Sequence, residues 1–143
     1  MSDAIIRQIL EGKLKTWADA RSPALKVAWQ NKKFDPPSTT YLRAFLLPAR
    51  TRSLDMAGKH RVYTGVFQVD IVTPANAGSA DPGSITAELE TLFPVVNGDG
   101  GGRYTASGIT VSVTLPITQG LALPGTGTSI TPTYFQYRAD VIT

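Results

Sequence analysis

The stretch HRVYTGVFQVDIVT, residues 60–73, decides the fold of this chain. Its side chains alternate, with Tyr63, Phe67, Val69 and Ile71 on one face of an extended backbone, and this period of two is typical of a strand with one buried face. At about 3.3 Å per residue, such a strand is longer than about 40 Å, which exceeds the usual strand of a small domain. We therefore predict a long strand that projects past its own sheet as an arm or hairpin.

One helix is predicted on each side of this strand. Apolar residues recur every three to four positions after Ser2, a residue type that caps helices, which predicts a helix over residues 2–20. Asp81 followed by Pro82 matches an N-cap and the first helical position. Apolar residues then continue at helical spacing to Phe93, and Pro94 ends the second helix.

Four other segments are predicted to be strands, at residues 25–29, 41–47, 109–115 and 134–142. Three of them alternate between apolar and polar side chains. The segment 41–47 does not alternate cleanly, which indicates a strand with both faces covered, and Pro48 is expected to end it.

The resulting order, αβββαββ, predicts the α+β class, with a mainly antiparallel sheet and two helices packed on one face. A polar, basic, turn-like segment is expected at residues 49–59, and two long loops at 97–108 and 116–132. Loops of that length in a compact domain are usually functional. The length of 143 residues corresponds to a single domain over residues 1–143.

The composition excludes several kinds of chemistry. The chain has no cysteine and one histidine, His60, which excludes disulfides, thiolate metal sites, cysteine nucleophiles and multi-histidine metal sites. The glycine-rich run 98–103 lacks the Lys-Ser/Thr ending of a phosphate-binding loop. Glu88 and Glu90 form the one close acidic pair, but two positions apart on a helix they point in different directions. We therefore expect no enzyme, no catalytic residue, no metal and no cofactor.

No membrane segment is predicted. The chain opens with Met1, Ser2 and Asp3 and has no basic region before an apolar run, unlike a signal peptide. The longest apolar stretch, residues 44–48, is far shorter than the roughly 20 residues that span a bilayer. We expect a soluble protein that is made in the cytoplasm and has no membrane partner.

The net charge of +3 is distributed unevenly along the chain. Residues 1–72 hold twelve basic and six acidic side chains, and residues 73–143 hold two basic and five acidic ones. Such asymmetry is typical of contact with a polyanion, or of a subunit whose two ends meet oppositely charged neighbours, unless the two halves interleave in the fold. A nucleic-acid surface, a contact with an acidic partner and a solvated strand edge remain open interpretations of the basic cluster. The candidate interface residues are Arg43, Arg50, Arg52, Lys59, Arg61 and Arg103.

Several short motifs, in this order and spacing over roughly residues 1–95, resemble those of phage tail terminator-like proteins. The motifs are VAWQN (27–31), FDPP (34–37), YLR (41–43), LLPA (46–49), YTGVFQV (63–69) and LFP (92–94). The chain after about residue 95 is similar to the family in length and strand count and carries no motif of its own.

The resemblance implies a subunit of a long-tailed phage or prophage that assembles as a ring, typically a hexamer. Such a ring caps the tail tube at its head-proximal end, stops further polymerisation and presents the surface that joins the head. The implied partners are further copies of the chain, the tail tube protein, the head–tail connector and, in passing, DNA in the lumen. The implied location is the virion tail, after assembly in the cytoplasm of the bacterial host.

Two other functions stay open, a head-closure, connector or other minor tail protein, and a small basic DNA-binding module. In the ring, the six basic residues are expected at an interface or in the lumen. The loops 49–59, 97–108 and 116–132 are expected to become ordered on assembly. The large aromatic residues are expected in the core and not in a site, namely Trp17, Trp29, Phe67 and Phe93.

Overall fold

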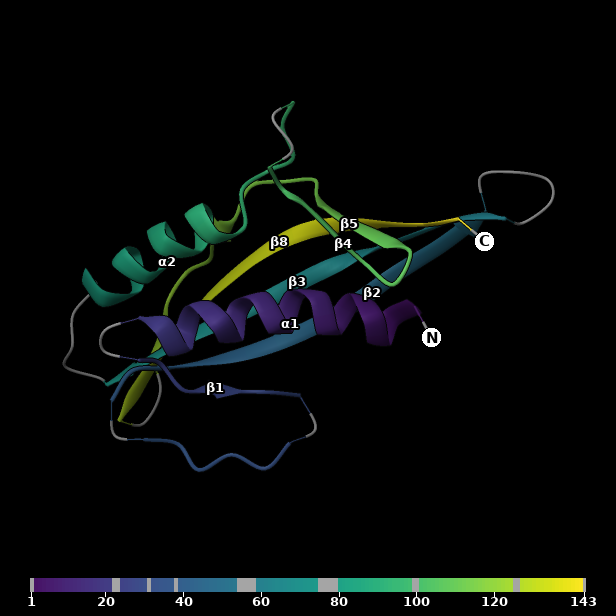
Figure 1. Cartoon of the computed structure of the whole chain (residues 1–143). Helices are drawn as coiled ribbons and strands as arrows, with labels where there is room; N and C mark the ends of the chain where they lie inside the picture. Colours follow the sequence, from purple (N-terminus) through teal and green to yellow (C-terminus); the bar gives the residue numbers. More distant parts are fainter. Residues whose placement is uncertain are drawn as a thin grey trace.

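Long paired strands form the middle of one sheet, and two helices lie across it (Figure 1). The computed structural model describes residues 2–21, 24–30, 32–37, 39–53, 59–74, 80–98, 101–124 and 127–142. The helices are α1 (Ser2–Ala20) and α2 (Ala80–Leu92). The strands are β1 (Val27–Ala28), β2 (Tyr41–Ser53), β3 (His60–Pro74), β4 (Arg103–Ala106), β5 (Ile109–Val113), β6 (Thr118–Gln119), β7 (Leu123–Pro124) and β8 (Thr128–Ile142).

The sheet is mixed and is built around β3. Its strands join in the order β1-β2-β3-β8-β5-β4, and β6 and β7 also pair with β8. β1 pairs with β2 in parallel, and the other pairs among the described residues are antiparallel. β3 pairs with β8 along its whole length, from His60 opposite Ile142 to Pro74 opposite Thr128. The long strand predicted over residues 60–73 is therefore confirmed, but the prediction that it projects past its own sheet is wrong, because β8 pairs with it to both ends and β2 pairs with it along most of its length.

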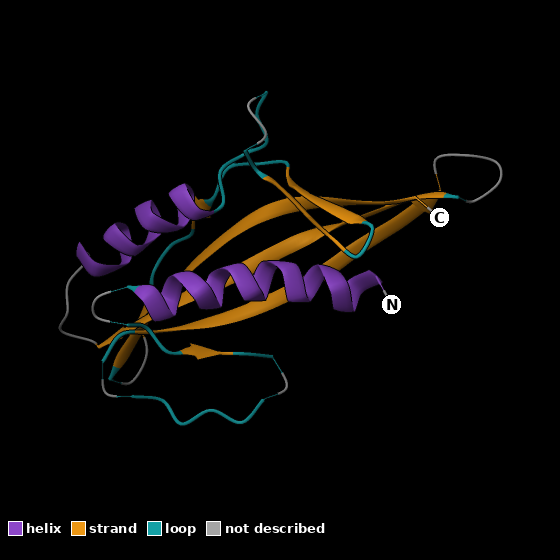
Figure 2. Ribbon diagram, in the orientation of Figure 1, coloured by secondary structure: helices purple, strands orange, loops and turns teal. Residues whose placement is uncertain are grey.

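The core lies between the sheet and the two helices (Figure 2). Ile6, Leu10 and Leu14 of α1 are fully buried there, at the spacing that the periodicity of residues 2–20 predicts. Phe93, directly after α2, packs against Phe67 of β3 and Phe135 of β8, with ring centroids 6.0 and 5.0 Å away. Phe67 and Phe93 are core residues, as expected, whereas Trp17 and Trp29 are half-buried and pack against the core from its rim.

An ion pair joins the two helices outside this core. The Arg21 guanidinium donates from Nη2 to Oε2 of Glu88 at 2.7 Å and from Nε to both carboxylate oxygens at 3.2 Å. This hydrogen-bonded pairing lowers the pKa of Glu88, against a smaller opposing effect of burial. The pair ties the end of α1 to the middle of α2.

The two faces of β2 are unequally buried. Residues opposite each other on paired strands share a face, so Leu46, which pairs with the buried Phe67, points toward the helices. Buried and half-buried residues alternate from Tyr41 to Leu46, and Leu47 is 45% exposed. The expectation that both faces of 41–47 are covered is therefore wrong.

Pro48 does not end β2, contrary to expectation, because it lies on the outer edge of the sheet. The backbone N–H of Leu42 donates outward to Lys26, and that of Leu46 donates outward to the Gln30 side chain. By the same alternation the nitrogen of Pro48 faces outward, where no ladder hydrogen bond is lost. Residues 49–53 of the predicted turn are therefore strand, and residues 54–58 lie outside the described part of the chain.

The loop predicted at 97–108 contains a hairpin. β4 pairs with β5 across a two-residue turn, in which Ser107 and Gly108 both have positive φ, 52° and 78°. A Ser-Gly pair between two alternating runs is the sequence signal for such a turn. In the sequence, the glycines before β4 indicate one continuous loop over residues 97–108, and the prediction therefore lacks this hairpin.

The loop predicted at 116–132 also contains strands. β6 and β7 lie within it, and β8 begins at Thr128, six residues before the predicted start. Thr131 and Thr133 are buried, and Pro132 takes its place in the ladder opposite Asp70. At the other end of the sheet, β1 covers two residues of the predicted strand 25–29.

Gly65 lies under the ring of Tyr137, and this contact yields a prediction. A Cβ at Gly65 would lie 2.6 Å from both the Leu47 carbonyl oxygen and the Tyr137 hydroxyl, whereas a Cβ at Gly12 in α1 meets nothing within 4 Å. We expect Gly65→Ala to lower the free energy of unfolding by about 1–3 kcal/mol through overpacking. We expect Gly12→Ala to raise it by up to about 1 kcal/mol through helix propensity. Urea unfolding at one protein concentration measures both, and an unchanged Gly65→Ala variant contradicts the described packing.

Candidate assembly surfaces

The sheet face that points away from the helices carries a row of arginines. On neighbouring strands Arg50 pairs with Thr64, Thr64 with Arg138, Arg138 with Ser112, and Ser112 with Arg103. Because paired residues share a face, the three arginines point to the same side of the sheet, with about 10 Å between one arginine and the next at the usual strand spacing. We call Arg50, Arg138 and Arg103 the arginine row.

A β-bulge places Arg50 and Arg52 on this face. Leu42, Ala44 and Leu46 of β2 point toward the helices, so even-numbered residues after them would do the same in a regular strand. The register shifts by one residue between Pro48 and Arg50, and this shift turns the following even-numbered residues to the open face.

Arg43 lies on the same face but is held by its neighbours. Its Nη2 donates to Oδ2 of Asp70 at 3.2 Å, and Gln68 donates to the other carboxylate oxygen at 2.7 Å. The Asp70 side chain is only 7% exposed, and both of its carboxylate oxygens accept hydrogen bonds within the sheet. Arg43 therefore stabilises Asp70 within the sheet.

At the far end of the long strands, Asp140 joins two basic side chains. Arg138 Nη2 donates to its Oδ1 at 2.9 Å, and His60 Nε2 lies 3.0 Å from the same oxygen. Partial burial acts to raise the pKa of Asp140, but the hydrogen bonds from Arg138 and His60 outweigh it and hold the pKa below its ordinary value. Arg138 was not among the predicted residues, although its alternation with the buried Tyr137 in a predicted strand places it on the polar face.

Arg61, Lys59 and Arg103, the remaining predicted residues, do not lie together. Arg61 pairs with Val141 and alternates with Val62, so it points to the helix side of the sheet, opposite Arg52. Lys59 is exposed directly before β3. Arg103 is exposed and donates from Nη1 to the backbone oxygen of Asn97 at 3.1 Å. The structure thus brings Arg43, Arg50, Arg52 and Arg103 to one face and separates Arg61 from them.

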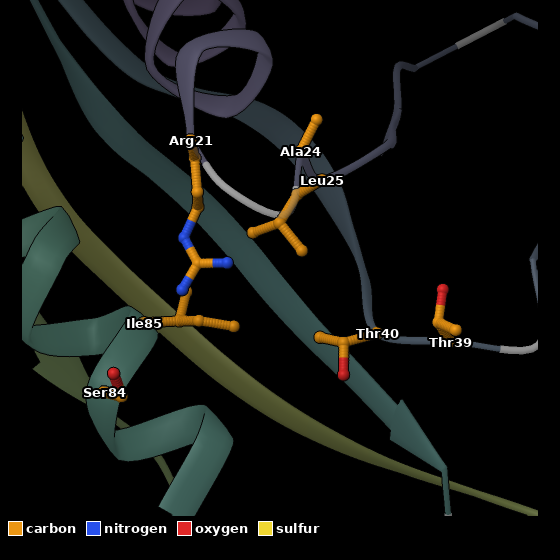
Figure 3. Close-up of a pocket in the computed structure, with 7 residues that line it drawn as sticks. All are labelled: Arg21, Ala24, Leu25, Thr39, Thr40, Ser84 and Ile85. Atoms are coloured by element: carbon orange, nitrogen blue, oxygen red, sulfur yellow. The ribbon is translucent and has the colours of Figure 1, made fainter.

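A cavity of about 330 Å³ lies between the end of α1, the start of α2 and the segment before β2 (Figure 3). Leu25 and Ile85 give it an apolar wall, and Thr39, Thr40 and Ser84 contribute hydroxyl groups. Arg21 reaches across it toward α2, where its guanidinium is engaged by Glu88. The cavity offers hydrogen bonds and apolar contact, with no acid–base pair among its lining residues.

The described residues contain no group of three or more His, Asp or Glu side chains placed to hold a metal ion. Neither α1 nor α2 is both long and apolar enough to cross a bilayer.

The Asp140 cluster yields a pH prediction. Because the pKa of Asp140 is lower in the folded protein than its ordinary value of 3.8, its contribution to stability is complete above that value and is lost as the pH falls through the lowered pKa. We expect Asp140→Asn to lower the free energy of unfolding at pH 7 by about 1 kcal/mol or less, and the difference to shrink in that acidic range. Unfolding curves measured from pH 7 to pH 2 test this.

The exposed Asp35 provides the control, since Asp35→Asn should change stability little at pH 7. A stability difference between Asp140→Asn and the unmodified protein that does not shrink between pH 7 and pH 2 would contradict the described pairing.

Comparisons with known proteins place the whole of this architecture in one family. A model of the family described as phage tail terminator protein matches residues 5–137. Nine chains of solved structures match, and one of them, whose name states no function, is 43% identical, with a TM-score of 0.80 over 97% of this chain and 96% of its own. No curated protein matches. The resemblance indicated by residues 1–95 is confirmed and extends into β8, so the chain belongs to the phage tail terminator protein family, whose members are components of the phage tail.

Proposed function

We propose that this protein forms a ring that caps the head-proximal end of a phage tail tube, ends tube polymerisation and provides the surface that joins the head. The observation that carries the proposal is the family match over residues 5–137, which spans most of α1, all of α2, β2 and β3, and two members of the arginine row, Arg50 and Arg103. Assembly takes place in the cytoplasm of the bacterial host, where tail subunits are made.

The shape of the subunit supports a structural role of this kind. The two helices lie across the sheet (Figure 2), and the arginine row, with Arg50 and Arg103 exposed, lies on the face that points away from them. A subunit of a ring has to meet a neighbour on each side, the tube below and the connector above, and it needs several distinct surfaces for this. The open sheet face and the ends of β2, β3 and β8 are two such surfaces.

The charges of the open face favour a specific protein contact or a lumen wall over a DNA-binding module. Arg43 and Arg138 are paired with Asp70 and Asp140, so their charge is largely balanced within the sheet. Tight, salt-dependent duplex binding requires several phosphate contacts at once. Arg50 and Arg52 are exposed, and we place them against a partner or the passing DNA in the assembled tail.

Tails assembled without this protein test the proposed function. Because a terminator ends polymerisation, electron microscopy of phage lacking it should show tail tubes of variable and excessive length without attached heads. Tails of normal length that lack heads would overturn the termination role and favour a joining role alone. Normal tails carrying heads would overturn both.

Charge reversal tests the open face. We expect Arg50→Glu combined with Arg52→Glu to impair tail-length control or head joining, because both side chains are exposed and the change reverses the charge of this surface. Thermal unfolding of the purified variant should stay close to that of the unmodified protein. The matched control is Arg50→Lys with Arg52→Lys, which keeps the charge and should preserve assembly. Unimpaired particles from the glutamate variant would remove these arginines from the interface.

A further inference from the structure

Two opposite edges of the sheet carry complementary apolar features. At one end of the sheet, the row of paired residues begins with Val27 of β1, passes through β2 and β3 to β8, and ends beside Leu123 of β7. β1 and β7 are therefore opposite edges at the same level, about four strand spacings or roughly 19 Å apart. A feature on one edge can meet a feature on the other only in a second molecule.

The β7 edge presents two exposed leucines. Leu121 is 85% exposed and Leu123 is 58% exposed, and we call this pair the leucine knob. The knob is held by backbone hydrogen bonds, because β7 pairs with β8 and the Gly120 N–H donates to the Pro132 carbonyl at 2.7 Å. Residues 114–124 contain no charged side chain. Single exposed leucines are common on protein surfaces, but two on a fixed, uncharged segment indicate a contact surface.

The β1 edge presents a hollow of about 350 Å³ with apolar walls formed by Leu25, Val27, Trp29 and Phe34, and we call it the apolar socket. The Phe34 ring rests on that of Tyr41, with centroids 5.3 Å apart. A cavity of about 150 Å³ holds a benzene-sized group, so the socket has room for a leucine side chain.

The charges on the rim of the socket balance one another in part. Lys15 donates to Asp19 at 2.7 Å on the α1 side, and Lys26 lies on the other side. The charges on the rim of the socket therefore do not require an acidic partner, and an uncharged group such as the leucine knob is compatible with them.

We propose that the leucine knob of one copy of this chain seats in the apolar socket of the next copy, edge to edge. Each copy offers one knob and one socket on opposite edges, which makes the contact heterologous, so repetition closes a ring or extends a filament. The proposal rests on the proposed ring for its closure. Because apolar burial drives the contact, assembly should persist when salt is raised, unlike an assembly held by surface charges.

Disulfide trapping tests the contact, and the absence of cysteine in the chain makes each introduced thiol unique. Two single variants, Leu121→Cys and Phe34→Cys, are purified as full chains, mixed and oxidised mildly. We expect a covalent dimer from the mixture and none from either variant alone, because the contact joins different residues. A combined variant carrying both cysteines should give a ladder of covalent oligomers.

The control is Val95→Cys, which is exposed outside the knob and should not crosslink to Phe34→Cys. Lys26→Cys on the socket rim replaces Phe34→Cys if the latter fails to fold. A dimer from Leu121→Cys alone would mean an isologous contact and would overturn the proposal. The proposal would also be overturned if the unmodified protein forms oligomers but the mixture of cysteine variants forms no crosslink. In that case the ring itself would stand.

A second measurement separates the contact from the ring. We expect Leu121→Ser with Leu123→Ser to raise the concentration at which oligomers dissociate by at least about tenfold, with unchanged thermal unfolding of the monomer. Native mass spectrometry across concentrations and salt measures this. An unchanged dissociation concentration would overturn the proposed role of the leucine knob. An unmodified protein that stays monomeric under all conditions overturns the contact and the proposed ring together.

Discussion

The difference in length between the central strands and the helices determines which surfaces of this protein stay open. With 15 residues, β3 is about 50 Å long at about 3.3 Å per residue, whereas α1 with 19 residues is about 28 Å long at about 1.5 Å per residue. β8 also has 15 residues and pairs with β3 throughout, so the ladder stays intact where no helix covers it. The backbone hydrogen bonds of neighbouring strands stabilise the uncovered end, and its side chains remain available for contacts.

The open surfaces are consistent with a subunit that works through contacts. The buried Asp70 and the partly buried Asp140 on the open face are paired with Arg43 and Arg138, so these charges are balanced within the sheet before it meets a partner. The bulge after Pro48 turns Arg50 and Arg52 outward, and the edges of the sheet carry the leucine knob and the apolar socket. Arg50, Arg52 and Leu123 lie on strands, and the apolar socket includes Val27 of β1. A ring built from such subunits would therefore have rigid contact surfaces, which control of tube length requires.

The sequence predicts the regular elements well and the faces of the sheet less well. The helix over residues 2–20 and the strand over 60–73 follow from periodicity, which depends on which side chains a core must bury. Periodicity does not reveal a bulge, so the face on which Arg50 and Arg52 lie could not be predicted. Strict alternation along β3 does place Arg61 on the helix side of the sheet. Pro48 looks like a strand end in the sequence and lies within β2, because the effect of a proline depends on which edge its nitrogen faces. The exposure of Leu121 is a tertiary property with no local signal.

The position of the protein in the virion is the most direct test of the account. Immunogold labelling of intact particles, with an antibody against this chain, can be read by electron microscopy at the junction, along the tube and at the distal tip. A terminator that caps the tube and joins the head predicts gold at the head–tail junction only. Gold along the tube or at the distal tip would contradict the account.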